Sequence, residues 1–179
     1  MKNFLDLELL SDNEIGALLQ LAKKLEREPI QKSLAGKVIG LLFMNPSLRT
    51  LASFQAGISQ LGGSSFVISP GQSTWGFECE SGVVMNGNKA EHIREALPVL
   101  AQYCDALGMR SFAEQKQLEV DLEEPMLNYT NELYEKPLIN MESAMNHPCQ
   151  ALADWKSLDD FAIPQQGRLV LSWANHPAP

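Results

Sequence analysis

Short apolar runs alternate along this chain with segments whose apolar residues recur at helical spacing. The apolar runs lie at 37–43, 65–69, 105–110, 137–141 and 169–173. The helical patterns lie at 11–25, 51–61, 88–103, 114–134 and 147–159. Regular alternation of strand and helix is typical of parallel strands joined by helical crossovers. The sequence therefore predicts the α/β class, with a mainly parallel sheet flanked by helices on both faces.

Capping signals indicate where several of these helices begin and end. Ser11 and Glu14 have the spacing of a capping box at the start of the first helix. Gly62 follows the second helical pattern, where a glycine commonly ends a helix. Asn88 and Glu91 predict the start of a helix that runs to about residue 103.

The length of the chain and its last segment predict two unequal parts. A chain of 179 residues is long enough for one generous domain or for one domain and part of a second. Residues 1–145 are expected to form one α/β domain. Residues 146–179 are expected to be a connecting helix and the first strand of a truncated second α/β domain. The glycine-rich segment 70–88 is long for a loop in a compact domain, and such loops are often functional.

The bulk composition argues against several classes of protein. The formal net charge of −8 argues against nucleic-acid binding, which depends on clustered cations. No apolar stretch approaches the roughly 18 to 20 residues that span a bilayer, so we expect no membrane segment. Three cysteines without close pairing, and an N-terminus without a secretory pattern, predict a cytoplasmic protein without disulfides. Three scattered histidines predict no metal site.

Polar side chains follow the predicted strands at the points where the strands end. They are Ser47, Arg49 and Thr50 after the first strand, Arg110 at the end of the third, Glu142, His147 and Gln150 after the fourth, and His176 after the fifth. Ligands of open α/β sheets bind outside the carboxyl ends of the strands. If the strands are parallel, these side chains share one edge of the sheet.

The segment from Ser47 to Thr50 allows two interpretations. In the first, Ser47 caps a helix and Arg49 is a solvated surface cation. In the second, the helix N-terminus, the two hydroxyl groups and the arginine together bind a phosphate. The glycine and lysine pattern of a nucleotide P-loop is absent from the sequence.

The other candidate residues also have plain structural explanations. Arg110 can be an ion-pair partner, and His147 can begin a helix that has Pro148 in its first turn. Cys149 beside His147 is a poor candidate for a nucleophile, because adjacency in sequence does not create a Cys–His pair in space. Trp75 can be a core or interface aromatic, a lid, or a side chain that reaches a neighbouring subunit.

Three motifs in order resemble those of the aspartate/ornithine carbamoyltransferase family. Ser47-Leu48-Arg49-Thr50 is similar to the family's Ser-x-Arg-Thr, and Gly108-Met109-Arg110 to its strand-end arginine. His147-Pro148-Cys149-Gln150 is similar to its His-Pro-x-Gln. The stretches FMNPSLRT, GQSTWGFE, GVVMNGNKAEHI, INMESAMNHPCQ and LSWANHPAP resemble the branch that acts on N-acetylornithine or N-succinylornithine in arginine biosynthesis.

The resemblance implies a carbamoyl phosphate-binding domain and a role for each candidate residue. Ser47, Leu48, Arg49 and Thr50 would hold the phosphate, and Arg110, His147 and Gln150 would hold the carbamoyl end, with Arg110 and His147 catalytic. Trp75 would complete the site of a neighbouring subunit in a homotrimer, and Glu142 would face the N-acylated ornithine. No metal and no cofactor are implied.

Two departures from the family pattern affect the expected activity. Leu51 stands where the family usually has a second arginine, which predicts weaker carbamoyl phosphate binding. Family members also continue beyond 179 residues into a domain that contacts the amino acid. Carbamoyl transfer is therefore expected to be impaired if the chain is truncated at Pro179. The alternatives are an ornithine or aspartate carbamoyltransferase, or a non-catalytic fragment that binds only carbamoyl phosphate or partner subunits. Ala90 lies in a segment that is expected to border the pocket for the acyl group. Its small neutral side chain favours neither an acetyl nor a succinyl group.

Overall fold

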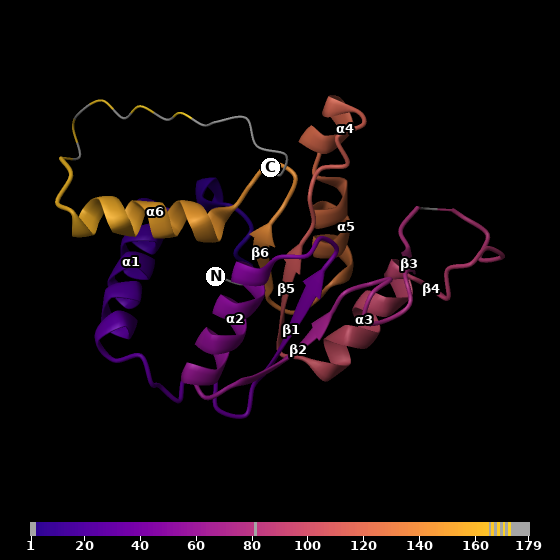
Figure 1. Cartoon of the computed structure of the whole chain (residues 1–179), viewed down its shortest axis with the longest axis horizontal. Helices are drawn as coiled ribbons and strands as arrows, with labels where there is room; N and C mark the ends of the chain where they lie inside the picture. Colours follow the sequence, from indigo (N-terminus) through magenta and orange to yellow (C-terminus); the bar gives the residue numbers. More distant parts are fainter. Residues whose placement is uncertain are drawn as a thin grey trace.

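The computed structural model describes residues 3–80 and 82–164, together with 166, 168, 170 and 172. Four parallel strands form its central sheet, in the order β2-β1-β5-β6 (Figure 1). They are β1 (Val38–Phe43), β2 (Ser64–Ile68), β5 (Ala106–Arg110) and β6 (Leu138–Glu142). The predicted α/β class and parallel sheet are confirmed, and the first four predicted strands match these four within one or two residues.

Helices cover both faces of the sheet because alternate residues of the buried strands point to opposite sides. On one face α3 (Ile93–Tyr103) and α5 (Pro125–Leu133) bury an apolar cluster that includes Leu42, Leu107 and Leu138. On the other face α2 (Leu48–Gln60) packs over a smaller cluster that includes Leu41 and Met141 (Figure 1).

Two further helices lie together beside the α2 face of the sheet (Figure 1). They are α1 (Asp12–Arg27), with the predicted Ser11–Glu14 capping box, and α6 (Pro148–Asp160). Salt bridges join them, from Lys23 to Asp159 and from Lys156 to Glu26. A short 3-10 helix, η1 (Leu7–Leu9), precedes α1, and Phe4 bridges to Ile139 of β6. No helix of the described part of the chain is long and apolar enough to cross a membrane.

The structure corrects two predicted helices. The helix expected from residue 88 begins at Ile93 instead, because Glu91–His92 is extended as β4 and pairs with Phe77–Glu78 of β3. The first strand of this small parallel pair lies within the segment 70–88, which was expected to be an irregular loop, and the second strand follows that segment.

The helical pattern at 114–134 contains two helices, α4 (Leu118–Leu122) and α5. The chain breaks between them at Glu124, which has a left-handed backbone conformation (φ 47°) and precedes Pro125. The residue before a proline is disfavoured in the helical conformation, which explains the break. The predicted strand at 169–173 and His176 fall on residues outside those described, since 169, 171, 173 and 176 are not placed.

Candidate functional site

The carboxyl ends of β1, β5 and β6 carry the polar side chains that the sequence singled out. The turn after β1 leads into Ser47, β5 ends at Arg110, and β6 ends at Glu142. Asn45 connects two of these ends, because its side-chain carbonyl accepts a hydrogen bond from the N–H of Phe112 at 2.8 Å. All strands of this sheet are parallel, so one edge collects the residues that follow each of them.

Ser47 caps α2, and its hydroxyl group also meets the hydroxyl group of Thr50. The Ser47 Oγ accepts from the Thr50 N–H at 3.3 Å, and the two hydroxyl oxygens are 2.9 Å apart. The first N–H groups of a helix have no intrahelical acceptor, so the start of α2 presents donors and the positive end of the helix dipole. Leu48 and Arg49 form the first turn, and the Arg49 side chain is exposed. The cap is confirmed, and its geometry is compatible with anion binding.

Arg110 joins this cap to the two neighbouring strand ends. The residue is only 7% exposed. Its guanidinium group forms an ion pair with Glu142, lies 3.5 Å from Thr50 Oγ1, and lies over the ring of Phe112 at 4.4 Å from the centroid. The Arg110 Nε–H is buried and has no hydrogen-bond partner among the described residues. Arg110 is therefore a buried cation with donor capacity left over.

His147 approaches the same carboxylate from the start of α6. Its Nδ1 accepts from the N–H of Gln150 at 3.3 Å, so the neutral ring carries its proton on Nε2. That Nε2 lies 3.4 Å from Glu142 Oε2. Arg110 and His147, which come from different strand ends, thus converge on one oxygen atom of Glu142.

Burial holds the pKa of His147 below its ordinary value of 6.5. Glu142 acts against this shift by favouring the protonated ring, and Arg110 acts in the same direction as burial. The neutral imidazole of His147, with a proton on Nε2, is the form present in the folded protein at neutral pH. It can donate a hydrogen bond without adding a second positive charge beside Arg110.

The lowered pKa predicts a loss of stability in mild acid. The unfolded chain takes up the His147 proton near pH 6.5, whereas the folded chain does so only at lower pH. The free energy of unfolding is therefore expected to decrease as the pH falls below 6.5, until the folded pKa is reached. Denaturant unfolding at a series of pH values should show a smaller decrease for His147→Gln than for the wild type. Equal pH slopes for both proteins would contradict the prediction.

Two of the expected site residues do not meet this group. The Gln150 side chain donates to Asp154 at 2.8 Å, so only its backbone N–H contacts His147. Trp75 lies between a turn at 71–73 and β3 and is 59% exposed, and its indole N–H donates to Glu91 at 3.0 Å. Cys149 is not a plausible nucleophile, because burial raises the pKa of its thiol to about 11.

The sequence did not indicate the residues that support the turn between β6 and α6. The Glu124 carboxylate accepts from the Ser143 hydroxyl group and from the Met145 N–H, the latter at 2.9 Å. The Ser143 N–H donates to the Asn146 carbonyl at 2.8 Å, and the buried Asn140 amide donates to Ser143 Oγ at 2.9 Å. Glu124 thus holds the turn between Glu142 and His147 from another element. The sequence signal was weak, namely a glutamate before a proline inside a helical pattern.

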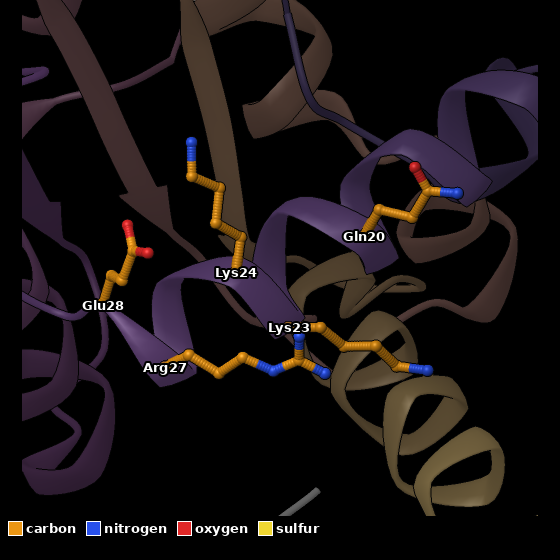
Figure 2. A pocket seen from close by; sticks show the side chains of 5 residues that line it. All are labelled: Gln20, Lys23, Lys24, Arg27 and Glu28. Carbon is orange, nitrogen blue, oxygen red and sulfur yellow. The ribbon is translucent and has the colours of Figure 1, made fainter.

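A hollow of about 300 Å³ lies elsewhere, on the surface of α1 (Figure 2). All five lining residues belong to α1 or directly follow it, and none comes from a strand end: Gln20, Lys23, Lys24, Arg27 and Glu28. Surface lysines that extend from a single helix are not evidence of a ligand-binding site. We place the candidate site at the sheet edge, where donors from three strand ends converge.

The carboxyl edge of the sheet is suited to binding a small ligand that carries an anionic group and, next to it, a polar oxygen atom. Hydroxyl and helix N-terminal donors come from Ser47 and Thr50, a buried cation from Arg110, and a neutral N–H donor from His147. Such fixed donors stabilise charge that develops on a bound oxygen. No cluster of three or more metal-ligating side chains occurs in the part of the chain that the structure covers.

Comparison with known proteins identifies the family of the chain. Residues 2–159 match the model of the aspartate/ornithine carbamoyltransferase, carbamoyl-P binding domain. The chain is 39% identical over its whole length to an N-acetylornithine carbamoyltransferase of Xanthomonas campestris pv. campestris, of which it covers 53%. It is 38% identical over 80% of its length to an N-succinylornithine carbamoyltransferase of Bacteroides thetaiotaomicron, of which it covers 45%.

Solved structures show the same similarity. A mutant N-acetyl-L-ornithine transcarbamylase, complexed with carbamyl phosphate and N-succinyl-L-norvaline, superposes with a TM-score of 0.92 at 39% identity. The superposition covers 100% of this chain and 55% of that one. The chain therefore spans about half the length of the relatives it matches. The family model matches residues 2–159, and the similarity to the Xanthomonas enzyme extends over the whole length of this chain. This protein therefore belongs to the aspartate/ornithine carbamoyltransferase family.

Proposed function

We propose that this chain binds carbamoyl phosphate at the carboxyl edge of its sheet. The observation that carries the proposal is the convergence of the three family motifs at one place, through the contacts of Arg110 with Thr50 and Glu142 and of His147 with Glu142. Ser47 to Thr50 bind the phosphate group. Arg110 and His147 bind the carbamoyl oxygen, and Gln150 joins them once its side chain leaves Asp154.

The complete protein transfers the carbamoyl group to the side-chain amine of an N-acylated ornithine, in the cytoplasm and in the service of arginine biosynthesis. The similarity to N-acetylornithine and N-succinylornithine carbamoyltransferases supports this substrate class. The amine attacks the carbamoyl carbon, negative charge develops on the carbonyl oxygen, and phosphate leaves. Arg110 and the Nε2–H of His147 stabilise that oxygen, while the start of α2 and Arg49 stabilise the leaving phosphate.

The proposed division of the chain follows from this role. Residues 1–145 form the carbamoyl phosphate-binding domain, and residues 146–179 connect it to an amino-acid-binding domain, towards which Glu142 faces. In a homotrimer the exposed Trp75 reaches the site of a neighbouring subunit. Light scattering checks the trimer, since a strictly monomeric chain contradicts this part of the proposal.

Titration calorimetry with carbamoyl phosphate tests the binding function directly. Binding that depends on Arg49 supports the proposal, and no detectable heat at millimolar ligand contradicts it. A rate assay on the complete protein with ornithine, N-acetylornithine and N-succinylornithine tests the substrate class. A preference for free ornithine would instead identify an ornithine carbamoyltransferase.

Replacing Leu51 with arginine is expected to strengthen carbamoyl phosphate binding and to weaken the fold. The added cation would lie one residue after Thr50, where the family usually has an arginine. Leu51 is partly buried and packs against the apolar cluster under α2, so a charge there costs roughly 1–3 kcal/mol of stability. Calorimetry and denaturant unfolding measure the two effects, with Leu51→Met as the control. Unchanged affinity would show that the position does not reach the phosphate.

A further inference from the structure

One oxygen of Glu142 lies where the two main donors of the site converge. Glu142 Oε2 is the ion-pair partner of Arg110 and lies 3.4 Å from His147 Nε2. These are the two side chains that the proposed function assigns to the carbamoyl oxygen. In the ligand-free protein the Glu142 carboxylate therefore has the contacts that the ligand needs.

The environment of Arg110 explains why a carboxylate lies there. The side chain is 9% exposed, and a cation removed from water needs a nearby anion. Glu142 does not use all of the donors, because the Arg110 Nε–H stays buried without a partner in the described chain. The guanidinium group is thus neutralised by Glu142 and still has an unused donor.

A phosphate group at the start of α2 would bring a second anion close to this ion pair. Arg110 Nη1 lies 3.5 Å from Thr50 Oγ1, which belongs to the proposed phosphate site. The Glu142 side chain is only 17% exposed, so water screens it poorly from such a neighbour. Two anions that share one buried cation repel each other.

We propose that Glu142 is an internal competitor for carbamoyl phosphate, whose carboxylate must leave Arg110 and His147 when the ligand binds. This rests on the proposed function of the same site. Binding is then an exchange of anions on Arg110, and its affinity is lower than the donors alone would provide. The released carboxylate becomes an acceptor for N–H groups of the amino-acid substrate. One residue would thereby serve both substrates.

A positioning role for Glu142 predicts the opposite sign. If the carboxylate held Arg110 in place for the ligand, its neutralisation would free the guanidinium group to move and would weaken binding. The effect of neutralising Glu142 on affinity therefore separates competition from positioning.

The test is calorimetric titration of carbamoyl phosphate into the wild type, Glu142→Gln and Glu142→Asp. The glutamine keeps the shape without the charge and is expected to bind about tenfold more tightly, the value of roughly one charge-assisted hydrogen bond. The aspartate keeps the charge but reaches less far, and is expected to be intermediate. Glu135→Gln removes an exposed carboxylate before the opposite end of β6, and is expected to match the wild type.

The outcomes separate this inference from the proposed function. If the wild type binds carbamoyl phosphate and Glu142→Gln binds it with equal or weaker affinity, Glu142 is not a competitor. The proposed carbamoyl phosphate site is then still supported. Tighter binding in both Glu142→Gln and Glu135→Gln also overturns it, because the gain would then reflect net charge alone. Failure of every variant to bind overturns both proposals. Melting curves confirm that each variant is folded.

Discussion

Arg49→Ala is expected to weaken carbamoyl phosphate binding by roughly 10- to 100-fold, since charge-assisted hydrogen bonds to a phosphate are among the stronger polar contacts. The same substitution is expected to leave the free energy of unfolding nearly unchanged. Arg49 lies on the first turn of α2 with its side chain exposed, so its removal opens no cavity. Calorimetry measures the first effect and denaturant unfolding the second.

Arg27→Ala is the matched control for Arg49→Ala. Arg27 is an exposed arginine at the end of α1, and it lines the surface hollow of Figure 2. The control removes the same charge and should leave the affinity unchanged. A loss of binding in Arg27→Ala with none in Arg49→Ala would move the anion site from the sheet edge to α1.

Arg110→Ala is expected to lower the free energy of unfolding by about 3–5 kcal/mol, as for other buried ion pairs that lose one partner. The substitution leaves the Glu142 carboxylate, which is 17% exposed, without its cation. It also removes the contact of the guanidinium group with the Phe112 ring. Binding of carbamoyl phosphate should be lost as well, because among the described residues Arg110 is the side chain that connects the ends of β5 and β6 to Thr50.

The double variant Arg110→Ala/Glu142→Gln isolates the part of the stability loss that comes from the unpaired charge of Glu142. Neutralising Glu142 removes the uncompensated carboxylate, so the double variant is expected to recover part of the stability lost in Arg110→Ala. Denaturant unfolding of the four members of this cycle measures the coupling. Additive effects of the two substitutions would mean that the ion pair contributes little to the fold.

Local patterns were sufficient for most of the fold. The apolar runs predicted β1, β2, β5 and β6 because strands buried on both faces are nearly continuously apolar. The alternation with helices predicted that these strands are parallel. Ser11 predicted the start of α1, and Ser47 was correctly considered as a cap, because capping depends on atoms only three residues apart.

The errors fall where distant segments override a local pattern. Glu91 with Asn88 had the spacing of a capping box, yet Glu91 pairs with Phe77 in a strand. In the pattern at 114–134 a glutamate before a proline was only a weak sign of the break at Glu124, and nothing local indicated that its carboxylate holds the turn after β6. Such contacts depend on where other elements pack, and no local spacing encodes them.

The sequence by itself determined the class of the fold, the parallel direction of its strands and the residues that follow each strand end. These depend on hydrophobic periodicity and on the rule that parallel strands share one carboxyl edge. Only the tertiary structure decided which side chains meet there. It placed the Glu142 carboxylate between Arg110 and His147, and it turned Gln150 towards Asp154. The physical reason is that a buried cation forms an ion pair with the nearest anion. Which anion is nearest depends on how three strand ends and two helix starts pack together.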